Sequence, residues 1–135
     1  MYQGGEIMAK KETADMSPKM TVSKRVHPKI RVCLAADDIF FGPGAAELIE
    51  LVETTGSLHE ACSRMRLSYS KGRYIVKRLE EQLGMPVVRR WAGGVGGGGA
   101  VLTDEGRQLL GAYREFALKV NKTADEIFKE CFAHD

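Results

Sequence analysis

Apolar residues recur along the chain with two different periods, and the change of period divides it into elements. Apolar and polar positions alternate over residues 29–35, which predicts a half-buried strand. After the turn signal Gly42-Pro43-Gly44, apolar residues return at helical spacing and predict a helix that ends at Gly56. Before residue 29 no period is sustained, so we expect residues 1–28 to form a flexible basic arm.

Two further helices are predicted to follow, with only a tight corner between them. Ser57 is placed to cap the first, and Ser68 to cap the second, which continues to about Leu83. Arg66 and Leu67 leave room only for a short turn between them. This arrangement is typical of a helix-turn-helix, in which the N-terminal half of the second helix enters the major groove of DNA.

The second of these helices has a basic face opposite its apolar face. Its candidate DNA contacts are Ser68, Tyr69, Ser70, Lys71, Arg73, Tyr74, Lys77 and Arg78. Arg73 is placed to form a bidentate pair with guanine, whereas Lys77 and Arg78 are placed to neutralise phosphate. The alternative is an ordinary solvated helix face, because most surface helices carry charge on their outer side.

Charge is distributed unevenly, although the whole chain carries a formal net charge of only +2. Residues 59–90, which include the predicted helix-turn-helix, hold eight lysines and arginines against three acidic residues. Residues 31–58 are acidic by contrast, with one arginine against five carboxylates. A concentrated basic stretch is typical of a nucleic-acid contact surface.

A glycine-rich segment separates two short runs, 87–90 and 100–102, that are predicted to be strands. A hairpin directly after a helix-turn-helix is a wing, and a glycine tip lets backbone amides approach phosphate closely. Trp91 is expected to pack against the domain, with insertion against DNA as the alternative. The run formally contains GxGxxG, but a strand follows it where a dinucleotide site needs a helix. The candidate DNA contacts of the wing are Arg89, Arg90, Gly94, Gly96, Gly97 and Gly98.

A long amphipathic helix is predicted after Thr103, which is placed to cap it. Its apolar residues follow nearly the a/d spacing of a coiled coil, and one small domain cannot easily cover a stripe about 45 Å long. We therefore expect a homodimer that reads an inverted-repeat operator. The alternative is that this helix folds back on residues 29–35 of its own chain. The predicted dimer interface consists of Leu109, Tyr113, Phe116, Val120 and Ile127.

Several short motifs together resemble one family of regulators. They are Gly56-Ser57-Leu58, Ala61-Cys62, Ser68-Tyr69, the run from Gly93 to Thr103, and Gly106. This set resembles the N-terminal domain of the ModE family, molybdate-responsive transcriptional repressors whose winged helix is related to that of LysR-type regulators. Over about residues 29–120, the resemblance implies a mainly α fold with a small β-hairpin. It implies a winged helix-turn-helix with a long C-terminal dimerisation helix, which binds double-stranded DNA.

Three positions depart from the family pattern. Val95 stands where the glycine run usually has lysine, and Arg73 where the recognition helix often has tryptophan. Arg66 stands at a turn position that usually holds glycine, so we expect a positive φ there. Family members also carry molybdate-binding domains, which nothing from Thr103 onward resembles. We therefore expect DNA binding, but no bound molybdate, from this chain.

No catalytic, cofactor or metal site is predicted, because the three histidines are scattered and the three cysteines form no ligand pattern. No apolar run is long enough to span a membrane, and this cysteine usage is typical of the cytoplasm. The expected segments are an arm over 1–28, a winged helix-turn-helix over 29–102 and a dimerisation helix over 103–135. Two other functions remain open: an interaction adaptor with the same fold, and an oxyanion or nucleotide sensor that uses the glycine loop.

Overall fold

The computed structural model describes residues 17–93 and 98–135, and its contacts divide the chain into two units. The larger unit is Arg31–Val120. The smaller unit is built from Met1–Ile30 and Asn121–Asp135, of which residues 17–30 and 121–135 are described. Helix α5 (Asp104–Cys131) begins in the larger unit and ends in the smaller one.

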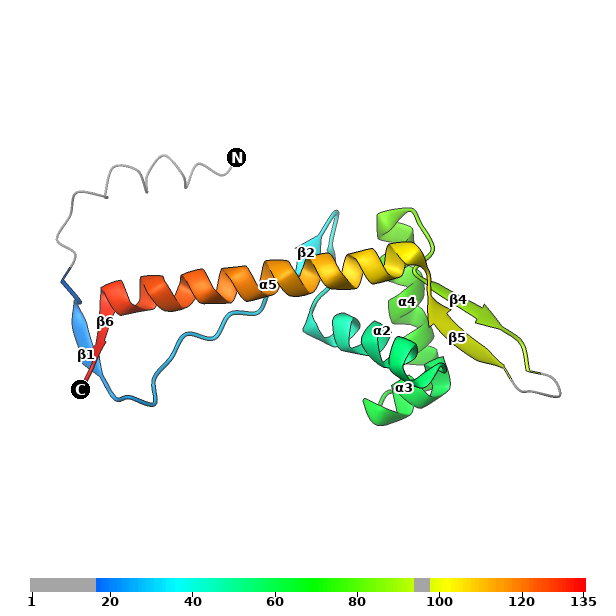
Figure 1. Ribbon diagram of the computed structural model, residues 1–135, viewed down its shortest axis with the longest axis horizontal. Helices are drawn as coiled ribbons and strands as arrows, with labels where there is room; N and C mark the ends of the chain where they lie inside the picture. The colour runs from blue at the N-terminus through cyan, green and yellow to red at the C-terminus, as the bar shows by residue number, and fades with distance from the viewer. Residues whose placement is uncertain (1–16, 94–97) are drawn as a thin grey trace. The chain divides into compact units, whose positions relative to one another are not determined.

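The larger unit is a winged helix-turn-helix, which confirms the predicted fold class. A short antiparallel hairpin precedes three helices, and a second antiparallel hairpin projects from those helices as the wing (Figure 1). The first part of α5 follows the wing. In chain order these elements are β2 (Leu34–Ala35), β3 (Ile39–Phe41), α2 (Pro43–Thr55), α3 (Leu58–Arg64), α4 (Tyr69–Leu83), β4 (Val88–Trp91) and β5 (Gly99–Leu102).

The two motif helices begin at the serine caps that the sequence predicted. Ser57 and Ser68 each accept a hydrogen bond, at 3.0 and 3.1 Å, from the amide three residues later in the helix. Between the helices Arg66 adopts a φ of 59°, the left-handed conformation expected for it. The amides of Arg66 and Leu67 bond back to carbonyls in the last turn of α3. The corner is therefore a Schellman motif with arginine in the position that usually holds glycine.

Helices α3 and α4 pack closely at Gly72. A methyl group added to Gly72 would overlap the Sγ atom of Cys62 on α3, so only glycine allows this separation of the helices. Burial raises the pKa of the Cys62 thiol, which favours its neutral form. Cys62 therefore acts as a small apolar residue of the core, among the side chains of α2, α3 and α4.

The segment before β2 is held by a helix instead of a strand. Val32 is buried, and its carbonyl accepts a hydrogen bond of 2.8 Å from the Tyr113 hydroxyl on α5. The Tyr113 ring packs edge-to-face on Phe41 at 5.0 Å between centroids. The prediction of a strand over 29–35 is wrong for residues 29–33, where the Val32 carbonyl bonds to a side chain of α5 and not to a neighbouring strand.

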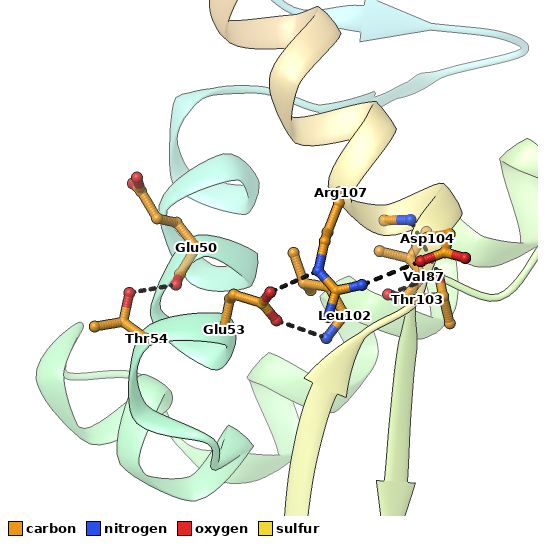
Figure 2. Close-up of polar contacts among 9 residues, drawn as sticks. Glu50, Glu53, Thr54, Val87, Leu102, Thr103, Asp104 and Arg107 are labelled. Carbon is orange, nitrogen blue, oxygen red and sulfur yellow. Dashed lines mark hydrogen bonds and ion pairs between the residues drawn. The ribbon is translucent and has the colours of Figure 1, made fainter.

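Glu53, near the end of α2, joins α2 to the wing and to α5 (Figure 2). Its carboxylate accepts hydrogen bonds from the Arg107 guanidinium at 2.7 Å and from the Leu102 amide at 3.1 Å. These contacts, the arginine foremost, hold the pKa of Glu53 below its ordinary value. The Thr103 hydroxyl caps α5 by accepting from the amide three residues later, and donates to the Pro86 carbonyl at 2.8 Å.

In the smaller unit, β1 (Met20–Val22) pairs in parallel with β6 (Phe132–His134). Phe128, in the last turn of α5, stacks on Phe132 with 4.8 Å between ring centroids. Part of the segment predicted as an arm is thus a strand, and the last residues of the predicted C-terminal helix are its partner. Among the helices described here, none is long and apolar enough to cross a membrane.

Replacing Gly72 by alanine is expected to destabilise the domain by about 1–3 kcal/mol, because the new methyl group overlaps Cys62. In a Cys62→Ala background the added methyl meets only ordinary contacts, at 3.8 and 3.9 Å. There Gly72→Ala is expected to be neutral or stabilising by up to about 1 kcal/mol. Urea denaturation of wild type, the two single variants and the double variant measures the free energy of unfolding in each background.

Gly111→Ala is the matched control, because an added Cβ at this helical glycine meets nothing within 4 Å. It is expected to stabilise the protein by about 0.5–1 kcal/mol. Tolerance of Gly72→Ala in the wild-type background would show that α3 and α4 are free to move apart.

The Glu53 junction is expected to weaken in acid. Because the folded-state pKa of Glu53 lies below its unfolded value of about 4.3, its contribution to stability is present above that pH. The contribution is lost as the pH falls through the folded-state pKa. Urea denaturation from pH 6 to pH 3 should therefore show the difference between wild type and Glu53→Gln shrinking. The control is Glu47→Gln, an exposed position on the same helix, and a constant Glu53→Gln difference would contradict the linkage.

Candidate nucleic-acid interface

The outer face of α4 carries most of the side chains that the sequence analysis assigned to DNA. Those exposed on this helix are Ser70, Lys71, Arg73, Tyr74 and Lys77. The Lys71 ammonium lies 5.9 Å from the centroid of the Tyr74 ring, so a cation and an aromatic face stand together near the helix N-terminus. This face can offer both hydrogen-bond donors and positive charge to a duplex.

Three of the predicted contacts on this helix are engaged within the domain. Ser68 uses its hydroxyl oxygen to cap α4, and the ring of Tyr69 is half-buried. Arg78 donates to the Ile39 carbonyl at 3.4 Å and pairs with Asp38 at 3.7 Å. Arg78 therefore links α4 to the first hairpin, and this carboxylate offsets part of its charge.

A groove of about 360 Å³ lies between α4 and the wing. Arg73, Lys77 and Arg90 line it, with Tyr69 and Tyr74 among the other lining residues. The acidic residue among those that line it is Glu80. Three cations against one carboxylate give this groove a positive balance of charge, which suits a polyanion.

Glu80 also anchors the wing. Its carboxylate accepts hydrogen bonds from the amides of Val87, at 2.8 Å, and Val88, at 3.1 Å. A carboxylate that is bonded to two amides repels an approaching phosphate less strongly than a free one. Helical periodicity indicates that Glu80 is polar but not which backbone amides it binds, so the amino-acid sequence contains no signal of this anchor.

A second groove, of about 730 Å³, lies between the N-terminal end of α3 and the wing. His59, Arg89, Arg90 and Trp91 line it together with backbone from both sides of the glycine run. The sequence predicts that His59 lies on the exposed side of the first motif helix, as a phosphate contact or a plain surface residue. The structure stacks its ring on that of Tyr69, with 3.6 Å between centroids and 4° between planes. This contact could not be predicted from the sequence, because the two rings lie ten positions apart on different helices.

The strands of the wing pair as predicted, from Val88 with Leu102 to Trp91 with Gly99. The Trp91 indole is half exposed and lies directly over Gly99, where a Cβ would overlap it. The alternatives for Trp91 were core packing and insertion against DNA, and its ring instead covers the opposite strand. Arg89, Arg90 and Gly98 are exposed. The predicted contacts Gly94, Gly96 and Gly97 lie outside the described residues.

The residues predicted for a dimer interface divide between the core and the surface. Tyr113 is buried in the core of its own domain, so its assignment to a dimer interface is corrected: the ring has no surface left to offer. Leu109 and Val120 are half-buried and pack against the same core. Phe116 and Ile127 are about half exposed. No cluster of metal-ligating side chains occurs among residues 17–93 and 98–135.

The fold and this interface define a winged helix-turn-helix of the kind used by DNA-binding transcription regulators. Residues 45–107 match the model of the bacterial regulatory helix-turn-helix protein, lysR family. The match runs from the start of α2 to the first turn of α5 and supports a DNA-binding regulator domain of this kind.

Two curated relatives are similar to this chain, one of them a ModE protein, which supports the ModE-like character that the motifs indicated. The molybdenum transport protein ModE of Azotobacter vinelandii is 32% identical over 80 residues, 59% of this chain and 30% of the relative. The molybdenum-pterin-binding protein MopB of Rhodobacter capsulatus is 38% identical over 72 residues, 53% of this chain and 27% of the relative. The chain thus spans less than a third of the length of these relatives.

Proposed function

We propose that this protein is a sequence-specific DNA-binding transcription regulator that represses by occupying its operator. The observation that carries the proposal is the cationic groove between α4 and the wing, with Arg73, Lys77 and Arg90 along it. The match of residues 45–107 to regulatory helix-turn-helix proteins supports the same function. No covalent chemistry is needed, because repression follows from occupancy of the promoter.

In this mechanism α4 enters the major groove and the wing follows the phosphate backbone. The exposed side chains of the first turns of α4, Ser70, Arg73 and Tyr74, meet base edges. Lys77 and the wing arginines contact phosphates, which set the orientation of the domain on the duplex. Arg73 has the donor geometry for a bidentate pair with guanine, the contact with the greatest share of sequence discrimination.

We further propose a homodimer through α5. Phe116 and Ile127 remain half exposed after the domain core has formed, although both belong to the predicted a/d stripe. A second copy of α5 would remove these side chains from water. Two recognition helices related by a two-fold axis would then read half-sites about 34–36 Å apart, or a multiple of this, in an inverted repeat.

Regulation by molybdate is not part of this proposal. The names of the two relatives refer to molybdenum and to molybdenum-pterin, but this chain covers only 30% and 27% of their lengths. Our prediction is that these 135 residues bind no molybdate by themselves. Adding molybdate to the DNA-binding assay below should leave the affinity unchanged, and any shift would contradict that prediction.

Fluorescence anisotropy tests the DNA-binding proposal. The affinity for the DNA upstream of the protein's own gene is compared with that for a shuffled duplex, at salt concentrations of about 50–200 mM. Wild type should prefer the native duplex and lose affinity linearly in log–log form as salt rises. Arg73→Ala should cost about 1–3 kcal/mol on the native duplex and relax specificity. Lys77→Ala should weaken binding to both duplexes and reduce the salt slope by about one.

Lys129→Ala is the charge-matched control, because Lys129 is an exposed cation in the last turn of α5. It should leave the preference for the native duplex unchanged. Absence of binding by the wild type at the lowest salt concentration would overturn the regulator proposal and favour the interaction adaptor.

Sedimentation velocity tests the dimer. Wild type should sediment as a dimer at micromolar concentration, and Phe116→Lys as a folded monomer, because a charge replaces an apolar contact. Leu118→Lys is the matched control, since Leu118 is more exposed than Phe116 but lies on another side of the helix. A monomeric wild type, or equal behaviour of the two variants, would contradict dimerisation through the predicted stripe.

A further inference from the structure

Tyr69, the first residue of α4, connects three parts of the interface. Its ring stacks on His59 of α3, with 3.6 Å between centroids. The guanidinium of Arg73, one turn further along α4, lies 5.9 Å from the Tyr69 centroid. The Tyr69 hydroxyl accepts a hydrogen bond of 3.2 Å from Arg90 Nη1 on the wing. One side chain therefore contacts α3, α4 and β4 simultaneously.

The position of this contact matters for the two grooves. Tyr69 and Arg90 line both of them, so their hydrogen bond lies where the groove beside α4 meets the groove beside α3. In the free protein the Tyr69 hydroxyl already accepts a hydrogen bond from Arg90, and the Tyr69 ring already stacks on His59. Tyr69 therefore has a structural role without DNA. Arg89 and Arg90 are both exposed on this strand, but the hydrogen bond to the Tyr69 hydroxyl comes from Arg90.

An exposed arginine samples many rotamers, and it loses that freedom when it binds a phosphate. The hydrogen bond from Arg90 to Tyr69 favours the rotamers that keep this guanidinium beside the ring. The stack on His59 in turn restricts the orientation of the Tyr69 ring. Part of the entropy cost of phosphate binding would thus be met during folding, which raises affinity without adding a contact to DNA.

We propose that Tyr69 is a positioning residue that orients Arg90 to take a backbone phosphate between α3, α4 and the wing. This inference rests on the DNA-binding function proposed above. It assigns Tyr69 a role through Arg90, in place of the direct DNA contact expected from the sequence. Tyr69→Phe separates the two parts of the cluster, since phenylalanine keeps the stack on His59 but cannot accept the hydrogen bond.

The first experiment needs no DNA. The order parameter of the Arg90 Nε–H group, measured by ¹⁵N relaxation in the free protein, should fall in Tyr69→Phe. That of Arg89 should not change, because the hydroxyl of Tyr69 bonds to Arg90. Tyr74→Phe is the matched control: it removes the hydroxyl of an exposed tyrosine on the same helix, and it should leave the Arg90 value unchanged. An unchanged Arg90 value in Tyr69→Phe would overturn the inference.

The second experiment is a double-mutant cycle of Tyr69→Phe and Arg90→Ala in the anisotropy assay. Arg90→Ala should reduce the salt slope by about one, because one phosphate contact is lost. Tyr69→Phe should weaken binding about 2- to 10-fold with the salt slope unchanged, since the charge of Arg90 remains. In the Arg90→Ala background the same substitution should have no further effect.

An equal loss from Tyr69→Phe in both backgrounds would overturn the inference and show that Tyr69 acts on DNA directly. Failure of the wild type to bind any duplex is a different result, because it overturns the proposed function. The Arg90 order parameter then decides the inference alone: a fall in Tyr69→Phe would support positioning of Arg90 for some other anion.

Discussion

The contact between Gly72 and Cys62 sets how closely helices α3 and α4 approach each other. The position of the DNA-binding face of α4 depends on that distance. Because Gly72 has no side chain, the Cys62 thiol fills the space between the helices. The Schellman corner at Arg66 then determines the direction in which α4 leaves α3. A tight corner and a close crossing together place the exposed face of α4 away from the core, where its cations remain in water.

The wing is held to the helices by carboxylates that bind its backbone amides. Val88 and Leu102 form the pair at the base of the hairpin, and their amides bond to Glu80 of α4 and Glu53 of α2. A two-stranded hairpin is marginally stable by itself in water. Anchoring both strands at the base stabilises it, and the Trp91 ring over Gly99 adds contact farther along. The wing can therefore present Arg89 and Arg90 from a fixed base.

The apolar residues of helix α5 divide between the core of its own domain and the surface. Tyr113 is committed to its own domain, through the Val32 carbonyl and the Phe41 ring. Phe116 stays half exposed beside it. The two interpretations of this helix, packing on its own chain or against a second copy, thus apply to different residues. The first is shown by Tyr113, and the second stays a proposal for Phe116 and its neighbours on the stripe.

Local signals in the amino-acid sequence were enough to establish the order, type and approximate bounds of the winged helix-turn-helix elements. Caps, turn glycines and apolar periods act within a few residues, so the capping roles of Ser57 and Ser68 followed from their immediate neighbours in the chain. The positive φ of Arg66 was expected from the family resemblance instead. Only the tertiary structure shows which residues from different elements contact one another. Three contacts could not be predicted from neighbouring residues, because each joins different elements of the fold. They are the bonds of Glu80 to the wing, the stack of His59 on Tyr69, and the hydrogen bond of Tyr113 to Val32. Such contacts depend on how helices and strands pack, and periodicity only shows which face of an element is available for packing.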